Sequence, residues 1–139
     1  MSETDWLTQP LYVNLDQQKS VAGRQEAFGT VLDLYNNVDT GEHVEMCWIK
    51  PGHALPTTDQ SNTTGEEIFV MDGSLALLDT KEEYTKWGWL RFPVHPGKER
   101  SSLTAGSAGA QVYRKVGHLT EDALSKEKIQ ITDDDNGDN

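Results

Sequence analysis

The stretch PGHALPTTDQSNTTGEEIFVMDG, residues 51–73, decides the fold of this chain. Its apolar run IFVM (68–71) is bounded by Gly65 and two acids on one side and by Asp-Gly (72–73) on the other. A short apolar run between turn residues is typical of a buried strand, and Asp-Gly is a tight-turn signal. We therefore predict a strand that turns at 72–73 and returns over residues 74–78.

More strand patterns surround this stretch. Residues 28–35 and 42–49 alternate in polarity on either side of the turn cluster NNVDTG, which predicts a hairpin. Residues 87–93 and 110–116 are predicted as further strands. Many short strands separated by turns are typical of a sandwich or a closed barrel, because closure hides the edges of a sheet. Helix is expected only near the C-terminus.

The domain organisation follows from these patterns. A chain of 139 residues has room for one sizeable core. We predict an N-terminal arm over residues 1–27, the β-domain over 28–119, a short helix and extension over 120–131, and a disordered acidic tail over 132–139, which has no apolar group to bury.

The charge balance excludes several classes of partner. Lys and Arg number 12 against 23 Asp and Glu, a formal net charge of -11. Nucleic acids and anionic membranes need clustered cations, so neither is an expected partner. No long apolar stretch or basic leader is visible, which predicts a cytoplasmic protein. The single cysteine, Cys47, excludes an internal disulfide and is predicted to be a small core residue.

A spacing pattern runs through the same central stretch. Gly52 is followed by five residues and Thr58, and Glu66 by six residues and Gly73. This resembles the first conserved motif of the cupin superfamily: Gly, five residues, His, one residue, His, three or four residues, Glu, six residues, Gly. With its flanks, the stretch looks like the cupin domain of the ChrR anti-sigma factor and its single-domain relatives. The resemblance covers about residues 28–119 and implies an all-β fold, a cupin-type jelly-roll β-barrel.

The chain departs from the cupin pattern at the metal ligands. Metal-binding cupins use three imidazoles and one carboxylate; here the first His falls on Thr58, the second on Gln60, and the third on Ser101 or Arg100. Only Glu66 remains, and a carboxylate with a hydroxyl and an amide is a poor transition-metal site. The resemblance therefore predicts no metal cofactor. An inward Arg100 would disfavour a cation and could pair with Glu66 or a ligand carboxylate.

The four histidines do not form a sequence cluster. They are His43, His53, His95 and His118, and no two lie close together in the sequence. If a divalent metal binds, the candidate ligands are Glu66, His53 and His95. The alternative without a metal is that each histidine lies singly, either at the surface or hydrogen-bonded to neighbouring residues.

Other polar and aromatic residues are assigned by strand alternation. Neighbouring residues in a strand face opposite sides, so one of Glu66 and Glu67 points inward and the other outward. Charged residues of the hairpin, Asp33, Glu42 and Glu45, are interpreted as a solvated face. Trp87 and Trp89 share a face and could line a cavity or an oligomer interface, although core packing is commoner.

These observations favour a metal-free cupin that acts as a small-molecule-binding or regulatory module. Its predicted cavity is lined by Thr58, Gln60, Glu66, Arg100 and Ser101, with Trp87, Trp89 and Tyr113 as apolar walls. The alternative is an enzyme, a metal-dependent cupin dioxygenase similar to acetylacetone-cleaving enzymes. We rank it second because the imidazole ligands of such an enzyme are missing.

Two expectations concern protein partners. Direct inhibition of a sigma factor is disfavoured, because in ChrR-like proteins a separate zinc-binding domain grips that partner. A homodimer is expected, because cupin barrels commonly pair through edge strands and the segments around Trp6 and residues 11–13 could cover an edge.

Overall fold

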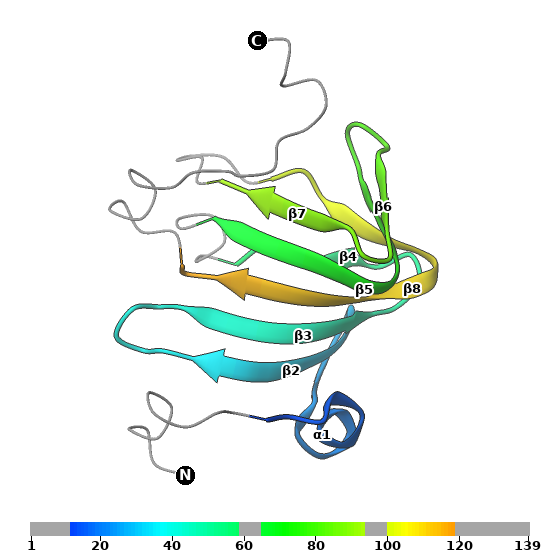
Figure 1. The fold of residues 1–139 in the computed structure, drawn as a ribbon. Coiled ribbons are helices and arrows are strands. Elements are labelled where there is room, and N and C mark those ends of the chain that lie inside the picture. The colour runs from blue at the N-terminus through cyan, green and yellow to red at the C-terminus, as the bar shows by residue number, and fades with distance from the viewer. Residues whose placement is uncertain (1–11, 59–64, 94–99, 119–139) are drawn as a thin grey trace.

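A computed structural model describes residues 12–58, 65–93 and 100–118 as one sheet with a short helix beside it (Figure 1). The elements in chain order are α1 (Leu15–Ala22), β1 (Arg24–Glu26), β2 (Gly29–Asn36), β3 (His43–Ile49), β4 (Ala54–Leu55), β5 (Glu66–Leu77), β6 (Glu83–Thr85), β7 (Trp89–Phe92) and β8 (Leu103–Val116). No helix among the described residues is long and apolar enough to cross a membrane.

The predicted hairpin of β2 and β3 is confirmed. The two strands pair antiparallel, with Val31 opposite Cys47 and Leu32 opposite Met46, and one register shift follows Asp33. Alternation carries Val31, Cys47 and Ile49 to the inner face, where they join the buried core. Cys47 is fully buried, as its position between apolar neighbours predicts.

The predicted turn at Asp72-Gly73 is wrong. β5 runs without a reversal from Glu66 to Leu77 and pairs with β8 on both sides of this dipeptide. The register shifts twice, between Val70 and Asp72 and between Gly73 and Leu75, so the dipeptide forms a bulged region instead of a hairpin. Gly73 has a φ of +72°, and a Cβ there would lie 2.1 Å from the Gly109 carbonyl oxygen, so glycine serves this close approach.

The long strand β8 organises the sheet. It pairs with β3, β4 and β5, and the strand order is β1-β2-β3-β8-β5-β6, with β7 on β5. The cupin jelly-roll expectation holds for the all-β fold, but the expected closure does not: within the described residues, the strand path ends at β1 and β6 without joining them. Both end strands have only three residues, which limits the exposed edge that closure was expected to hide.

One face of the sheet carries the core. Ile68, Val70, Leu75, Leu103 and Val112 are all fully buried there. Glu66 shares this inward parity and is 1% exposed, whereas the side chain of Glu67 is 30% exposed. The prediction that these two acids face opposite sides is confirmed, and it places one carboxylate inside an apolar core.

The expectation that helix is confined to the C-terminus is wrong, because α1 lies in the N-terminal arm. Asn14 caps it by accepting a hydrogen bond from the backbone N–H of Gln17 at 3.1 Å. No residue of α1 is buried, so it has no apolar periodicity by which the sequence could reveal it. The helix predicted over residues 120–131 and the tail after it lie outside the described residues.

Candidate functional site

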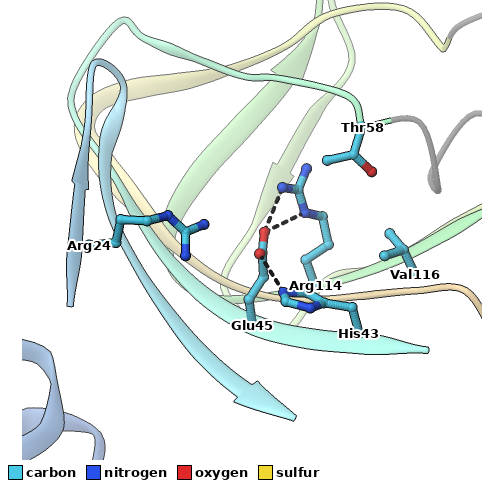
Figure 2. A pocket seen from close by; sticks show the side chains of 6 residues that line it. All are labelled: Arg24, His43, Glu45, Thr58, Arg114 and Val116. Carbon is cyan, nitrogen blue, oxygen red and sulfur yellow. Dashed lines mark hydrogen bonds and ion pairs between the residues drawn. The ribbon is translucent and has the colours of Figure 1, made fainter. Parts of the chain in front are cut away.

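A pocket of about 230 Å³ opens on the inner face of the sheet (Figure 2). Two cross-strand pairs of β3 and β8 form most of its wall: His43 opposite Val116, and Glu45 opposite Arg114. Arg24 from β1 and Thr58 after β4 complete the lining. Pockets for drug-sized ligands are usually larger, about 300–1,000 Å³, so this one suits a small molecule.

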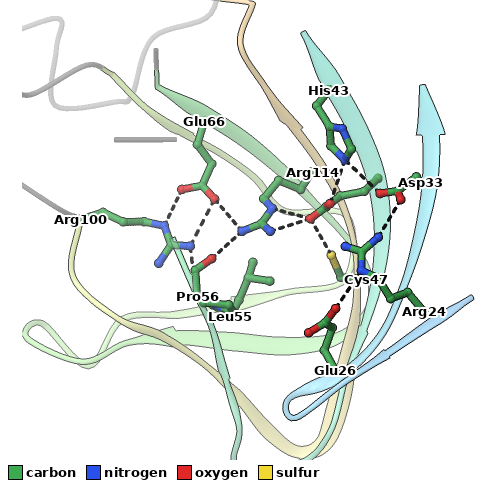
Figure 3. Close-up of polar contacts among 11 residues, drawn as sticks. Arg24, Glu26, Asp33, His43, Cys47, Leu55, Pro56, Glu66, Arg100 and Arg114 are labelled. Carbon is green, nitrogen blue, oxygen red and sulfur yellow. Dashed lines mark hydrogen bonds and ion pairs between the residues drawn. The ribbon is translucent and has the colours of Figure 1, made fainter. Parts of the chain in front are cut away.

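Arg114 is the centre of a buried ionic network (Figure 3). Its Nε and Nη2 donate to Oε2 of Glu45 at 2.9 and 2.5 Å. Its Nη1 donates to the carbonyl oxygen of Pro56 at 2.6 Å and to Oε2 of Glu66 at 3.3 Å. Arg114 and both acids are at most 5% exposed, so the charges compensate one another away from solvent.

Arg100 completes the network from the other side of Glu66. Its Nε donates to Glu66 Oε1 at 2.5 Å, and its Nη2 reaches Glu66 Oε2 and the carbonyl oxygen of Leu55, both at 3.2 Å. The expectation that Arg100 could pair with Glu66 is confirmed. Both oxygens of the one carboxylate left from the cupin ligand set are therefore bound by guanidinium groups.

The network changes the acidity of its members. Burial opposes ionisation of Glu45, but the charge and hydrogen bonds of Arg114 outweigh it and hold the pKa of Glu45 below its usual value. Burial and the negative charge of Glu45 together raise the pKa of the Cys47 thiol, whose sulfur lies 3.3 Å from Glu45 Oε2. Glu45 is thus an ionised acceptor, and Cys47 is a protonated thiol rather than a nucleophile.

A second cluster lies beside the pocket and shares Arg24, His43 and Glu45 with its lining, whereas Asp33 and Glu26 stand outside that lining. Nε2 of His43 is 3.0 Å from Asp33 Oδ1 and 3.1 Å from Glu45 Oε1. Arg24 holds Asp33 from behind, with Nη1 at 2.6 Å from Oδ2, and also contacts Glu26 through Nε at 2.8 Å. Among the described residues, Asp33, His43 and Glu45 are the set whose donor atoms could hold a metal ion, within 4.8 Å of one another.

The chemistry of this donor set points in two directions. An imidazole and two carboxylates suit a first-row divalent metal. Arg24 and Arg114 nevertheless bind the other oxygen of each carboxylate, and this leaves too little negative charge to balance a divalent ion at the same place. The set can therefore act as hydrogen-bonding groups for a ligand without any metal.

The structure distributes the predicted cavity residues over several places. Thr58 lines the pocket, and Glu66 and Arg100 lie in the network behind it. The hydroxyl of Ser101 instead accepts from the backbone N–H of Asp79 at 3.2 Å. Gln60 lies outside the described residues.

The aromatic residues predicted as cavity walls do not line the pocket. Trp87 and Trp89 are 64% and 52% exposed, so core packing is also wrong for them. Tyr113 and Trp89 both pair with Phe69, whose side chain faces away from the core side of β5. The strand predicted over residues 87–93 begins only at Trp89, and Trp87 lies in the turn before it.

The two described members of the predicted alternative metal set, His53 and Glu66, interact with other groups. His53 is exposed, and its Nδ1 lies 3.1 Å from the carbonyl oxygen of Pro51, whereas Glu66 is enclosed by arginines. His95 lies outside the described residues. His118 lies 4.0 Å from Glu67 on the outward side, and burial together with Lys115 lowers its pKa.

Sequence reasoning predicted one of the six pocket residues, Thr58, and missed Val116 and the four ionisable ones: Arg24, His43, Glu45 and Arg114. The interpretation of Glu45 as solvated is wrong, because the same alternation that buries Cys47 also buries Glu45. Arg114 lies between the buried Val112 and Val116 in the same parity. Strand alternation in β3 and β8 places these residues on the same face as their buried neighbours, and this could have predicted their burial. The assumption that charged residues face water led to the opposite assignment.

The comparisons with known proteins agree with the topology. No protein-family model and no curated protein matches the chain. An acetylacetone dioxygenase from Acinetobacter johnsonii superposes with a TM-score of 0.60 at 13% identity, over 78% of this chain and 74% of that one. A chain of the complex between Rhodobacter sphaeroides SigE and the anti-sigma ChrR superposes with a TM-score of 0.54 at 9% identity, over 81% of this chain and 73% of that one.

An RmlC-like cupin protein from Ralstonia eutropha gives a TM-score of 0.51 at 12% identity, over 66% of this chain and 57% of that one. The chain thus spans little more than half the length of this relative. At such low identities the similarity concerns the fold. The chain has the cupin fold.

Proposed function

We propose that this chain binds a small polar molecule in the pocket of Figure 2 and acts as a metal-free binding or regulatory module. The observation that carries the proposal is the engagement of both Glu66 oxygens by Arg100 and Arg114. Two guanidinium groups next to the remaining carboxylate repel a metal ion and replace the charge that such an ion would bring. The pocket beside them remains open to a ligand.

The pocket wall supports binding of a hydroxyl- or carboxylate-bearing molecule. His43, Glu45 and Arg114 offer hydrogen-bond donors and acceptors held by their own partners, so they are ordered before a ligand arrives. Val116 supplies an apolar contact. A small molecule held in this way would be oriented by a few polar groups, as is common in small binding sites.

The test is a thermal-shift and NMR screen with small hydroxy acids, amino acids and polyols. We expect at least one probe to raise the unfolding temperature and to shift the backbone signals of β3 and β8. His43→Gln should abolish this response, whereas His53→Gln, the same change at an exposed histidine outside the pocket, should leave it intact. Equal responses in both variants would place binding elsewhere.

A metal-dependent enzyme is the second candidate, and the cluster of Asp33, His43 and Glu45 favours it. Two structures with this fold, one of them from Acinetobacter johnsonii, carry the name acetylacetone dioxygenase. Elemental analysis and titration with Mn²⁺, Fe²⁺ and Zn²⁺ distinguish the candidates. Near-stoichiometric metal that is lost in Asp33→Asn would favour the enzyme over the metal-free module.

We also propose a homodimer in the cytoplasm. Of the N-terminal segments expected to cover an edge, the one around Trp6 and the first residue of the segment 11–13 lie outside the described residues, and Tyr12 is exposed. Light scattering at micromolar concentration tests the dimer, and a mass of one chain would contradict it.

A further inference from the structure

The pocket and the network behind it do not balance their charges. Within the part of the chain that the structure describes, four carboxylates belong to the connected set, against three guanidinium groups, and one negative charge remains when His43 is counted as neutral. The carboxylates are those of Glu26, Asp33, Glu45 and Glu66, and the guanidinium groups those of Arg24, Arg100 and Arg114. This excess favours a positively charged group of a ligand beside the carboxylates.

The acceptors for such a group converge at His43. Asp33 Oδ1 and Glu45 Oε1 lie 3.0 and 3.1 Å from the same atom, Nε2 of His43. A single N–H serves one of these oxygens with good geometry, and a carboxylate oxygen can accept more than one hydrogen bond. The two oxygens therefore keep capacity for a donor-rich cation, and a primary ammonium brings three N–H groups and one positive charge.

Donors for an anionic group lie on the same pocket wall. Arg24 uses Nε on Glu26 and Nη1 on Asp33, and its Nη2 makes no hydrogen bond within the described part of the chain. Arg114 uses its Nη2 for one hydrogen bond, to Glu45, so a second N–H remains. In Figure 2, Arg24 projects toward the Glu45 carboxylate from one side, and Arg114 holds that carboxylate from another. A ligand carboxylate can meet both guanidinium groups.

We infer that the ligand of this pocket is a small zwitterion of the α-amino-acid type. Its ammonium group binds Asp33 and Glu45, and its carboxylate binds Arg24 and Arg114. The volume of about 230 Å³ and the single apolar wall residue, Val116, restrict the side chain to a small one. The inference rests on the proposed function, because it names the ligand class of that site.

Three probes of similar size separate the two ends of the ligand. L-alanine carries both charged groups, ethylamine carries only the ammonium, and propionate carries only the carboxylate. Calorimetric titration of the full chain near neutral pH should show alanine binding at least about tenfold more tightly than either other probe, since each end contributes a charge-assisted hydrogen bond.

Two exposed positions allow each end to be removed without opening the core. Arg24→Gln should remove the preference for alanine over ethylamine, and Asp33→Asn should remove the preference for alanine over propionate. Lys50→Gln and Asp39→Asn make the same changes at exposed residues outside the pocket and should keep both preferences. Circular dichroism confirms that all four variants fold.

The outcomes separate this inference from the proposed function. Propionate or ethylamine binding as tightly as alanine overturns the zwitterion. A hydroxy acid or polyol that binds in the pocket while no amino acid does also overturns it, but leaves the proposed function standing. If no small molecule binds the wild-type chain, both fail.

Discussion

Arg100 and Glu66, 34 residues apart in the chain, meet as a fork with Nε on Oε1 at 2.5 Å and Nη2 on Oε2 at 3.2 Å. Their side chains are only 6% and 1% exposed. The fork joins the segment before β8 to the start of β5, and the bond from Arg100 to the Leu55 carbonyl adds β4. The ion pair that lies behind the pocket therefore also connects three parts of the sheet.

Removing one charge of this fork should destabilise the protein strongly. Glu66→Gln keeps the shape of the side chain but leaves two guanidinium groups short of a buried counter-charge, which should cost about 3 kcal/mol of the free energy of unfolding. Urea denaturation measures it. Glu67→Gln, the same change on the outward face of β5, should cost less than about 0.5 kcal/mol. Equal losses would show that burial of Glu66 does not matter.

Removing both partners of the fork should recover part of that loss. In Glu66→Met with Arg100→Met, apolar side chains replace the buried pair, and Arg114 retains Glu45. We expect the double variant to be at least about 1 kcal/mol more stable than Glu66→Met alone, because the unpaired guanidinium of Arg100 is gone. Additive losses in a double-mutant cycle would argue against direct coupling of the two residues.

Stability should fall in acid through Glu45. Its pKa is lowered in the folded state, so the unfolded chain binds a proton first as the pH falls below the ordinary glutamate value of 4.5. The stabilisation is present above that pH and is lost as the pH falls through the folded pKa. Urea midpoints between about pH 7 and about pH 3 should fall more steeply for the wild type than for Glu45→Gln. Parallel curves would contradict this assignment.

Cys47 should be unreactive in the native state. It is fully buried, and burial together with the Glu45 carboxylate raises the pKa of its thiol. A thiol reagent such as Ellman's reagent should therefore label the chain only after guanidinium chloride unfolds it, since the thiolate is the reactive form. Labelling in native buffer at the rate of a free cysteine would show that β3 opens readily.

The protein should be more stable with glycine at position 87 than with alanine there. The N–H of Gly88 donates to the carbonyl oxygen of Thr85 at 2.9 Å, which places Trp87 third in a four-residue turn with a φ of +74°. Glycine favours that conformation, and another residue costs about 1–2 kcal/mol there. Both variants lose the ring contact with Phe69, whose centroid is 5.9 Å away, so their difference isolates the backbone.

Thermal or urea unfolding of the two Trp87 variants checks this prediction. We expect the free energy of unfolding of Trp87→Gly to exceed that of Trp87→Ala by about 1 kcal/mol. The sign is diagnostic, because at an ordinary position glycine is the less stable residue by about 0.4–1 kcal/mol. Alanine at or above glycine would show that residue 87 relaxes out of the left-handed region.

Sequence patterns predicted the parts of this protein that depend on neighbouring residues. Alternation determined the hairpin of β2 and β3, the burial of Cys47 and the opposite faces of Glu66 and Glu67, because side chains in a strand alternate wherever the strand lies. The same local reasoning failed at Asp72-Gly73. Whether such a dipeptide turns or bulges depends on the partner strand, and β8 continues to pair with β5 beyond it.

The tertiary structure alone decided what the inward charges do. Glu45 and Arg114 are 69 residues apart, and only the register of β8 between β3 and β5 brings them together beside Glu66. Strand periodicity assigns a side chain to a face but not to a partner, since pairing depends on which strands become neighbours. That pairing compensates the free-energy cost of burying the two charges. It also leaves an excess negative charge around the pocket.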